Sequence, residues 1–115
     1  MSKILEPTDL TRLAWTTALR TQGHRKCRKI LWGFGPEVCA MALLAETVGE
    51  TRNTFSGYES VGSKAGLQAM QIDEVMAMND GMACSTEQTR WLNKPQTFAK
   101  IADVIDSWFA PEKSK

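Results

Sequence analysis

Little in this sequence points to a chemical reaction. The chain of 115 residues has one histidine and three cysteines, and no two cysteines have the CxxC spacing of redox or zinc sites. It has no GxSxG, no HExxH and no glycine-rich phosphate-binding loop. The histidine, His24, lies in a basic stretch that offers no carboxylate to orient it. The sequence therefore predicts a protein that is not an enzyme and carries no cofactor.

Long hydrophobic runs are also missing. The longest, from Val38 to Ala45, has eight residues, whereas a helix that crosses a bilayer needs about 20. The segment MSKILEPTDL has charges and a proline where a signal peptide has its apolar part. Thiols without a secretion signal are typical of a reducing compartment, so we expect a cytoplasmic protein of the host cell and no membrane contact.

The net charge is small, but it is unevenly distributed. A formal charge of +1 gives no strong field toward nucleic acid or membrane. Residues 1–35 contain seven Lys and Arg against two acids, and residues 36–80 contain two against seven. A folded chain with this pattern presents a basic and an acidic face, which suits a polar partner.

Apolar periodicity predicts a mainly α fold, a small single-domain bundle of about four helices over residues 1–115, with a frayed tail at 111–115. The expected helices cover about residues 8–22, 36–48, 69–79 and 98–110. The second begins with Pro36 in its first turn and is apolar nearly all round, so we expect it to be the most buried element.

Two apolar stripes define expected buried faces. In the first helix the stripe, which Trp15 and Leu19 widen, consists of Leu10, Leu13, Ala14, Thr17 and Ala18. In the last helix, which follows the N-cap Thr97, it consists of Phe98, Ile101, Ala102, Ile105, Trp108 and Phe109.

The connecting segments are less regular. Ile30-Leu31-Trp32 indicates a strand-like or irregular segment that ends at a glycine turn. Residues 50–66 are polar, contain three glycines and predict a long loop, with room for one short β-hairpin around Ser56-Gly57. Asn79-Asp80-Gly81 is interpreted as the stop of the third helix rather than as an acid or ligand site, because Asn and Asp favour turns and Gly ends helices. The role of the loop 81–96 that follows is left open, but with Trp91 expected at its tip this loop is the better place to look for function.

Seven residues form the candidate partner-binding set. The run from His24 to Lys29 contains four cations, which could bind phosphates, although a solvated charged loop is the more common explanation of such a run. Three aromatic residues lie in predicted loops, where they act either as contact anchors or as lids folded over the core. The set is Arg25, Lys26, Arg28, Lys29, Trp32, Tyr58 and Trp91.

A zinc site is a weaker alternative. His24 and Cys27 have an H-x2-C spacing, and Cys39 and Cys84 supply two further ligands of the types that zinc prefers. Against this, Cys39 lies in the most apolar segment, where a cysteine usually packs as a small hydrophobic residue. We therefore predict no metal.

Four motifs occur in a familiar order. They are Trp15 with Ala18-Leu19, the segment from Cys39 to Glu46 (CAMALLAE), Met78-Asn79-Asp80, and the segment from Thr97 to Ile105 (TFAKIADVI). In these motifs, spread over most of residues 10–108, the chain resembles a loose group of small uncharacterised proteins encoded by bacteriophages and prophages. Ala42 replaces the glycine of that group, and the stretch between Asp80 and Thr97 is longer than is typical there.

The resemblance implies a phage origin and a compact helical fold, and it brings no activity with it. Together with the uneven charge and the loop aromatics, it leads us to expect a non-enzymatic accessory protein that binds a host protein and inhibits or redirects it. The alternative is a nucleic-acid or nucleotide binder that uses the basic segment 24–29. Methionine and tryptophan side chains on so small a domain also allow a homodimer.

Overall fold

The computed structural model describes residues 6–27, 31–33, 35–83 and 89–109. Within these ranges the chain forms five α-helices, one short 3-10 helix and no named strand, so the predicted mainly helical bundle is confirmed with one helix more than expected. The elements are α1 (Pro7–Thr21), η1 (Gly23–Arg25), α2 (Ala40–Thr47), α3 (Tyr58–Lys64), α4 (Ala69–Asp80) and α5 (Phe98–Phe109). None of the described helices is long and apolar enough to span a membrane.

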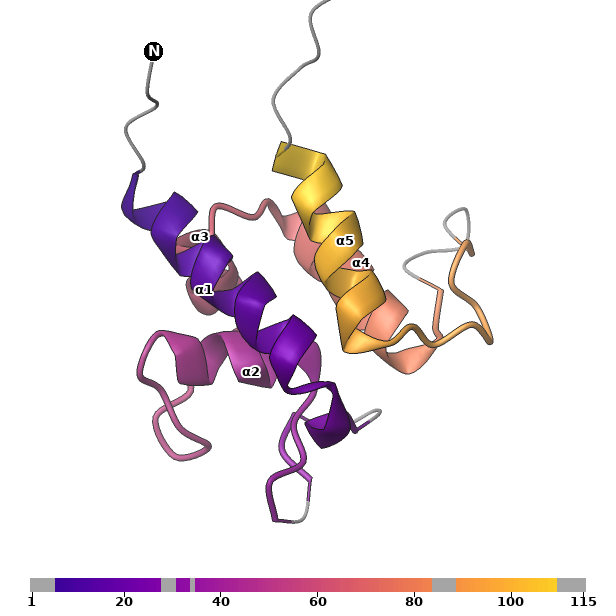
Figure 1. The fold of residues 1–115 in the computed structure, drawn as a ribbon, viewed down its shortest axis with the longest axis horizontal. Helices are drawn as coiled ribbons and strands as arrows, with labels where there is room; N and C mark the ends of the chain where they lie inside the picture. Colours follow the sequence, from indigo (N-terminus) through magenta and orange to yellow (C-terminus); the bar gives the residue numbers. More distant parts are fainter. Residues whose placement is uncertain (1–5, 28–30, 34, 84–88, 110–115) are drawn as a thin grey trace, which may run out of the picture.

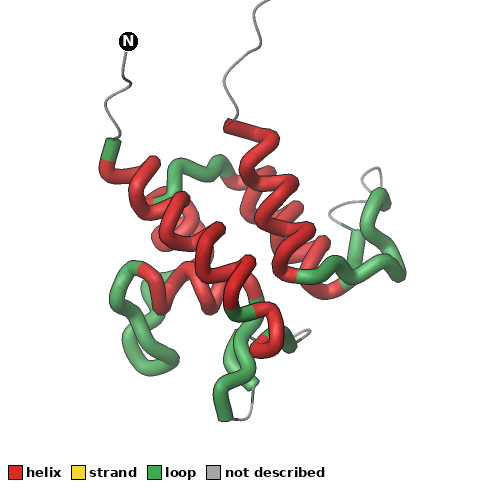
Figure 2. Tube along the Cα trace, viewed as in Figure 1, coloured by secondary structure: helices red, strands yellow, loops and turns green. Residues whose placement is uncertain are grey.

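The first and last helices form an antiparallel pair, and the loops lie at the periphery of the bundle (Figures 1 and 2). Two arginines of α1 join this pair. Near the end of α1, the Arg20 guanidinium lies 2.8 Å from an oxygen of Asp103 and 2.7 Å from one of Asp106. Near its start, the guanidinium of Arg12 lies 3.6 Å from the ring centre of Phe109.

Helix α2 is the centre of the core, as its composition predicts. Its first six residues, 40–45, are all buried, and the helix contacts α1, α3 and α4. The indole nitrogen of Trp15 donates to the carbonyl of Ala40 at 2.9 Å, which joins α1 to the start of α2.

The start of α2 differs from the prediction. It begins at Ala40 with Cys39 as its N-cap, not at Pro36. The reason is that Val38 is held in extended conformation by isolated bridges to Lys26 and Trp32. Trp32 therefore does lie in a strand-like contact, as predicted for its segment.

The buried face of α1 also differs from the prediction. Leu10 and Leu13 are 54% and 56% exposed, whereas Trp15 and Leu19 are fully buried. The helix is rotated so that Trp15, its largest apolar side chain, enters the core together with Leu19 one turn later, because burying an indole removes more apolar surface from water than burying a leucine. Leu10 and Leu13 are left on the solvent side.

Residues 50–66 contain a helix, α3, and no hairpin, which corrects the predicted long loop. Gly57 has φ +115° and begins the helix. Val61 and Ala65, one helical turn apart, are buried. Gly62 lies so close to Ile72 of α4 that a Cβ at this position would collide with the isoleucine side chain. Glycine therefore serves helix packing here and not a turn.

The last two helices agree with the sequence. Gly81 adopts the left-handed conformation, φ +72°, just after α4, and the Thr97 hydroxyl accepts a hydrogen bond from the Lys100 amide at 3.1 Å at the start of α5. The first four residues of the predicted α5 stripe are buried, and Trp108 and Phe109 are half-buried. The expected tail at 111–115 lies outside the described residues.

Candidate functional site

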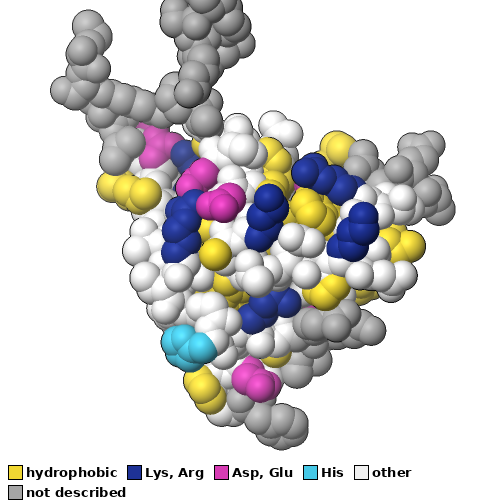
Figure 3. Space-filling view, turned by 45° about the vertical axis from the view of Figure 1, so that its right-hand side comes forward, with side chains coloured by type: hydrophobic (Ala, Val, Ile, Leu, Met, Phe, Trp, Pro, Cys, Tyr) yellow, Lys and Arg dark blue, Asp and Glu magenta, His cyan; other side chains and the backbone are white. Residues whose placement is uncertain are grey.

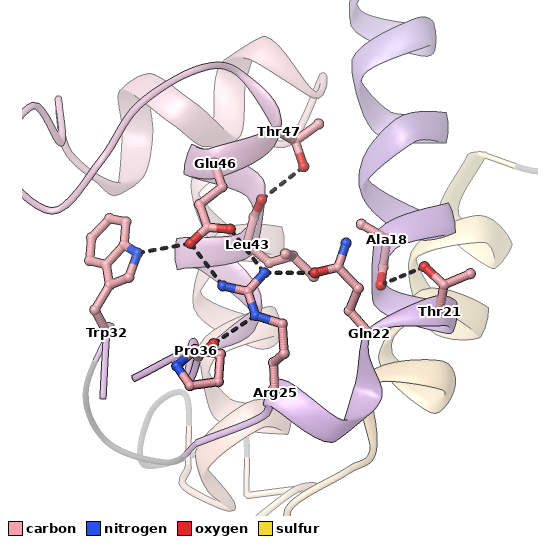
Figure 4. A network of polar contacts seen from close by, with 9 residues as sticks. All are labelled: Ala18, Thr21, Gln22, Arg25, Trp32, Pro36, Leu43, Glu46 and Thr47. Carbon is pink, nitrogen blue, oxygen red and sulfur yellow. Dashed lines mark hydrogen bonds and ion pairs between the residues drawn. The ribbon is translucent and has the colours of Figure 1, made fainter. Parts of the chain in front are cut away.

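The first cation of the basic segment points into the protein. The Arg25 guanidinium binds the Glu46 carboxylate through two contacts of 3.0 and 3.1 Å (Figure 4). It also donates to the carbonyl of Pro36 and to the side chain of Gln22, each at 2.6 Å. The Trp32 indole donates to the same Glu46 carboxylate at 3.2 Å. Arg25 is thus committed to an internal network, which corrects its assignment as a free partner contact.

The second cation is committed in the same way. The Lys26 ammonium donates to the backbone carbonyl of Asn79 at 2.8 Å and is part-buried. Arg28 and Lys29 lie outside the described residues. The basic segment therefore loses two of its four cations as candidates for phosphate binding.

Asn79 has a larger role than ending a helix. Asn79 is buried, with only 1% of the residue exposed. The oxygen accepts from the Ala40 amide at 3.0 Å, and the nitrogen donates to the Cys27 carbonyl and to Asp80, both at 2.9 Å. The predicted structural role of Asn79-Asp80-Gly81 is confirmed, and the side chain also joins α4 to the start of α2 and to the segment before it. Its position on the buried stripe of α4 was the available signal.

Trp91 is a lid and not an exposed anchor at the tip of its loop. It is 6% exposed, and its indole donates to the Glu74 carboxylate at 3.0 Å. The Arg90 guanidinium covers the ring at 4.4 Å from its centre. Because its side chain is buried, Trp91 leaves the candidate partner-binding set.

The other two candidate aromatics come together. The rings of Trp32 and Phe55 meet edge to face with centres 5.6 Å apart, and those of Phe55 and Tyr58 do so at 5.5 Å. Tyr58 is 38% exposed, and partial burial raises the pKa of its phenol. This row of aromatics leads to a hollow in the surface.

The hollow, here called the methionine groove, has a cavity of about 490 Å³. Its apolar lining comes from Leu31, Cys39, Met41, Tyr58, Met76 and Met82. A smaller hollow of about 210 Å³ continues it along α4 and shares Met76, Asp80 and Met82 with it. The main cavity lies in the range of about 300–1,000 Å³ that is usual for ligand sites.

The groove is better suited to binding apolar side chains of a partner than to catalysing a reaction. Unbranched, polarisable thioethers adapt to irregular partners. The Cys39 thiol accepts from the Ala42 amide at 3.4 Å, and burial raises its pKa to about 11. Burial also raises the pKa of Cys27. Both thiols are therefore protonated near neutral pH, and a protonated thiol is a poor nucleophile.

The residues of the zinc alternative do not assemble in the described part of the chain. No group of three or more His, Cys, Asp and Glu side chains suited to a metal occurs there, so His24, Cys27 and Cys39 form no such group. Cys84 lies outside the described residues.

Comparison of the chain with known protein families, with curated proteins and with solved structures finds no match. The function therefore has to be argued from the geometry of the chain itself. Residues from well separated parts of the sequence, from Leu31 to Met82, line the methionine groove together.

Proposed function

We propose that this chain is a non-enzymatic accessory protein of a bacteriophage that binds a host protein and inhibits or redirects it. The observation that carries the binding role is the methionine groove, where Met82 and Tyr58 remain 48% and 38% exposed beside a cavity. Methionine-rich surfaces are typical of proteins that adapt to a partner segment. The phage origin rests on the four sequence motifs.

The groove is favoured over the other exposed apolar residues because it is concave. Leu10, Leu13, Met70 and Leu92 are 46–74% exposed but line neither hollow of the groove. Apolar side chains scattered singly over a surface are ordinary in monomeric proteins. A cavity lined by several apolar side chains offers a partner an anchor pocket, which is where most binding energy concentrates.

Native mass spectrometry of the tagged chain, purified from a bacterial host at moderate salt, tests this proposal. Two exposed methionines provide a matched pair: Met82 lines the groove, and Met70 does not. We expect the wild type and Met70→Glu to carry the mass of one host protein, and Met82→Glu to lose it, because a carboxylate cannot enter an apolar pocket unpaired. Equal capture by all three chains, or capture by none, would contradict the proposal.

A second candidate function is binding of nucleic acid. Several Lys and Arg side chains spread over one face of the molecule (Figure 3). Arg90, Lys94 and Lys100 are exposed, unlike the inward-facing Arg25 and Lys26. Phosphate-dependent binding weakens steeply with salt. This candidate therefore requires DNA, RNA or nucleotide binding at low salt that is lost as salt rises, and absence of binding at low salt removes it.

A further inference from the structure

We infer that Cys27 and Cys39 form a reversible disulfide, which makes this pair a redox-sensitive modification site at the wall of the methionine groove. Cys39 lines the groove, and both residues carry reduced thiols in the structure. This property is independent of the proposed binding function. Three features of the fold support it: the register of two extended segments, the hydrogen bonds that hold them, and the different exposure of the two thiols.

The two cysteines occupy opposite positions in neighbouring extended segments. Lys26 and Val38 form a parallel bridge. The Val38 amide donates to the Arg25 carbonyl at 2.8 Å, and the Cys27 amide donates to the Val38 carbonyl at 3.0 Å. Cys27 and Cys39 each follow one member of that bridge, so they are the next pair in the same register. Because successive side chains of an extended segment alternate between its faces, both cysteine side chains leave on the same face.

This register brings the two cysteines within reach of a disulfide. Adjacent extended segments lie about 4.8 Å apart, and the Cα atoms that a disulfide joins are usually separated by about 4.4–6.8 Å. The pKa of the Cys39 thiol is raised chiefly by burial and further by the nearby Cys27. That second cause agrees with the proximity of the two thiols.

Asn79 holds the two segments together just beyond the cysteines. Its side-chain nitrogen donates to the Cys27 carbonyl at 2.9 Å, and its side-chain oxygen accepts from the amide of Ala40, the residue after Cys39, at 3.0 Å. The Cys39 amide donates to the Leu31 carbonyl at 2.7 Å. The backbone around the pair is therefore held in register while the two side chains turn toward each other.

The different exposure of the two thiols sets the order of the reaction. Cys27 is part-exposed, whereas Cys39 is 8% exposed and its sulfur accepts from the Ala42 amide at 3.4 Å. With a small-molecule disulfide as the oxidant, the Cys27 thiolate attacks one sulfur of the reagent and releases its other half as a thiolate. The Cys39 thiolate then attacks the Cys27 sulfur of this mixed disulfide and releases the second half. The chain loses two protons and two electrons, and the reagent gains them as two thiols.

Oxidised glutathione tests the inference on the full chain. After incubation at mildly alkaline pH, which supplies the thiolates, we expect the monomer to lose about 2 Da and to regain this mass on reduction. Trypsin cuts on both sides of Cys27 and between Cys39 and Cys84, so the peptide masses identify the linked pair. We expect the pair to be Cys27 and Cys39.

Two variants that each keep two thiols form a matched pair. Cys84→Ser keeps Cys27 and Cys39 and should form the same disulfide as the wild type. Cys27→Ser keeps Cys39 and Cys84 and should form an internal disulfide about tenfold or more slowly. Circular dichroism shows whether each variant is folded.

A second measurement separates the effect of the fold from that of closeness in the sequence. The ratio of disulfide to dithiol in Cys84→Ser is measured at equilibrium in a glutathione buffer, with and without a denaturing concentration of urea. In urea the two cysteines meet only as the ends of a flexible loop. We expect the ratio to be about tenfold or more higher in the folded chain, because the register positions the pair in advance.

Three results would overturn the inference. The first is an internal disulfide that uses Cys84 in the folded wild type. The second is a chain that stays reduced or stops at mixed disulfides with glutathione. The third is a disulfide-to-dithiol ratio that is no higher in the folded chain than in urea.

Discussion

The side-chain amide of Asn79 lies between α2 and α4, under the methionine groove. It satisfies the Ala40 amide at the first residue of α2 and the Cys27 carbonyl, and it is buried from water. Helix starts leave their first amides without partners inside the helix, so a side chain from a distant helix acts as part of the cap. One residue thus sets how the two helices that line the groove lie against each other.

Asn79→Ala should lower the free energy of unfolding by roughly 2–4 kcal/mol, because it leaves a buried donor and a buried acceptor unpaired. Urea denaturation measures the change. The control is Asn53→Ala at an exposed turn position, which should change stability by less than about 0.5 kcal/mol. Equal effects of the two substitutions would show that the amide does not join the helices.

Cys39 gives a second prediction at the residue scale. Burial raises the pKa of its thiol from 9.0 to about 11 in the folded chain. Below pH 9 the thiol is protonated in both the folded and the unfolded chain, and its contribution to the free energy of unfolding is fully present. Between pH 9 and 11 the unfolded chain releases the proton first, so stability falls with rising pH, by about 2–3 kcal/mol for this group.

Cys39→Ser isolates that effect, since serine keeps an acceptor at the N-cap and does not ionise in this range. Denaturant unfolding at pH 8, 9, 10 and 11 should show a smaller loss of stability in the variant than in the wild type. The pKa values of Cys27 and Tyr58 are also raised, but both groups are present in both chains. If the stability of the two chains falls in parallel with rising pH, the loss does not come from the Cys39 thiol.

At the scale of elements, the contact of α3 with α4 depends on the absence of a side chain. An added Cβ at Gly62 would collide with Ile72. Gly62→Ala should therefore destabilise the chain by about 1–3 kcal/mol through overpacking, measured by thermal or urea unfolding. Adding Ile72→Val, which removes the terminal methyl carbon, should recover part of the loss.

Gly23→Ala is the control for this substitution, because no atom lies within 4 Å of a Cβ at that position. It should change stability by less than about 1 kcal/mol. If Gly62→Ala is as harmless as Gly23→Ala, the close approach of α3 and α4 is wrong.

The helices differ in how well the local sequence predicts them. Helices α4 and α5 carry regular apolar periods and clear terminal residues, Gly81 and Thr97, and both were predicted within one or two residues of their ends. Helix α3 was missed because Gly57 and Gly62 resemble turn residues locally. The role of Gly62, a close packing contact with Ile72, depends on a partner helix that the local sequence does not contain.

The buried face of α1 was predicted only in part, for a related reason: it included Trp15 and Leu19, but Leu10 and Leu13 were wrongly placed on it. Periodicity identifies which residues share a helix face but not how much apolar surface each of them can bury. The burial of Trp15 decides how α1 is rotated about its axis. Similarly, the early start predicted for α2 ignored the pairing of Val38 with Lys26 and Trp32, which is long-range in the sequence. In both cases a tertiary contact overrides a local preference.

At the scale of the whole molecule, charge and aromatic content were poor guides to the site. Arg25 and Lys26 form a dense basic run in the sequence, yet each is held by an internal acceptor, Glu46 or the Asn79 carbonyl. The segments that line the methionine groove are far apart in the chain, and none is unusual alone. A site of this kind exists only after folding, so the sequence offered Tyr58 and Trp32 as hints and not the cavity.

The most direct test of the account uses the methionine methyl groups as reporters. Three of them, in Met41, Met76 and Met82, line the groove, whereas Met70 is exposed elsewhere and Met78 is buried in the core. The measurement is a methyl NMR spectrum of the chain labelled with carbon-13 at these groups, with and without the host protein that copurifies with it. We expect shifts for the three groove methyls and unchanged signals for Met70 and Met78. Binding that shifts Met70 alone, or that leaves all the groove methyls unchanged, would contradict it.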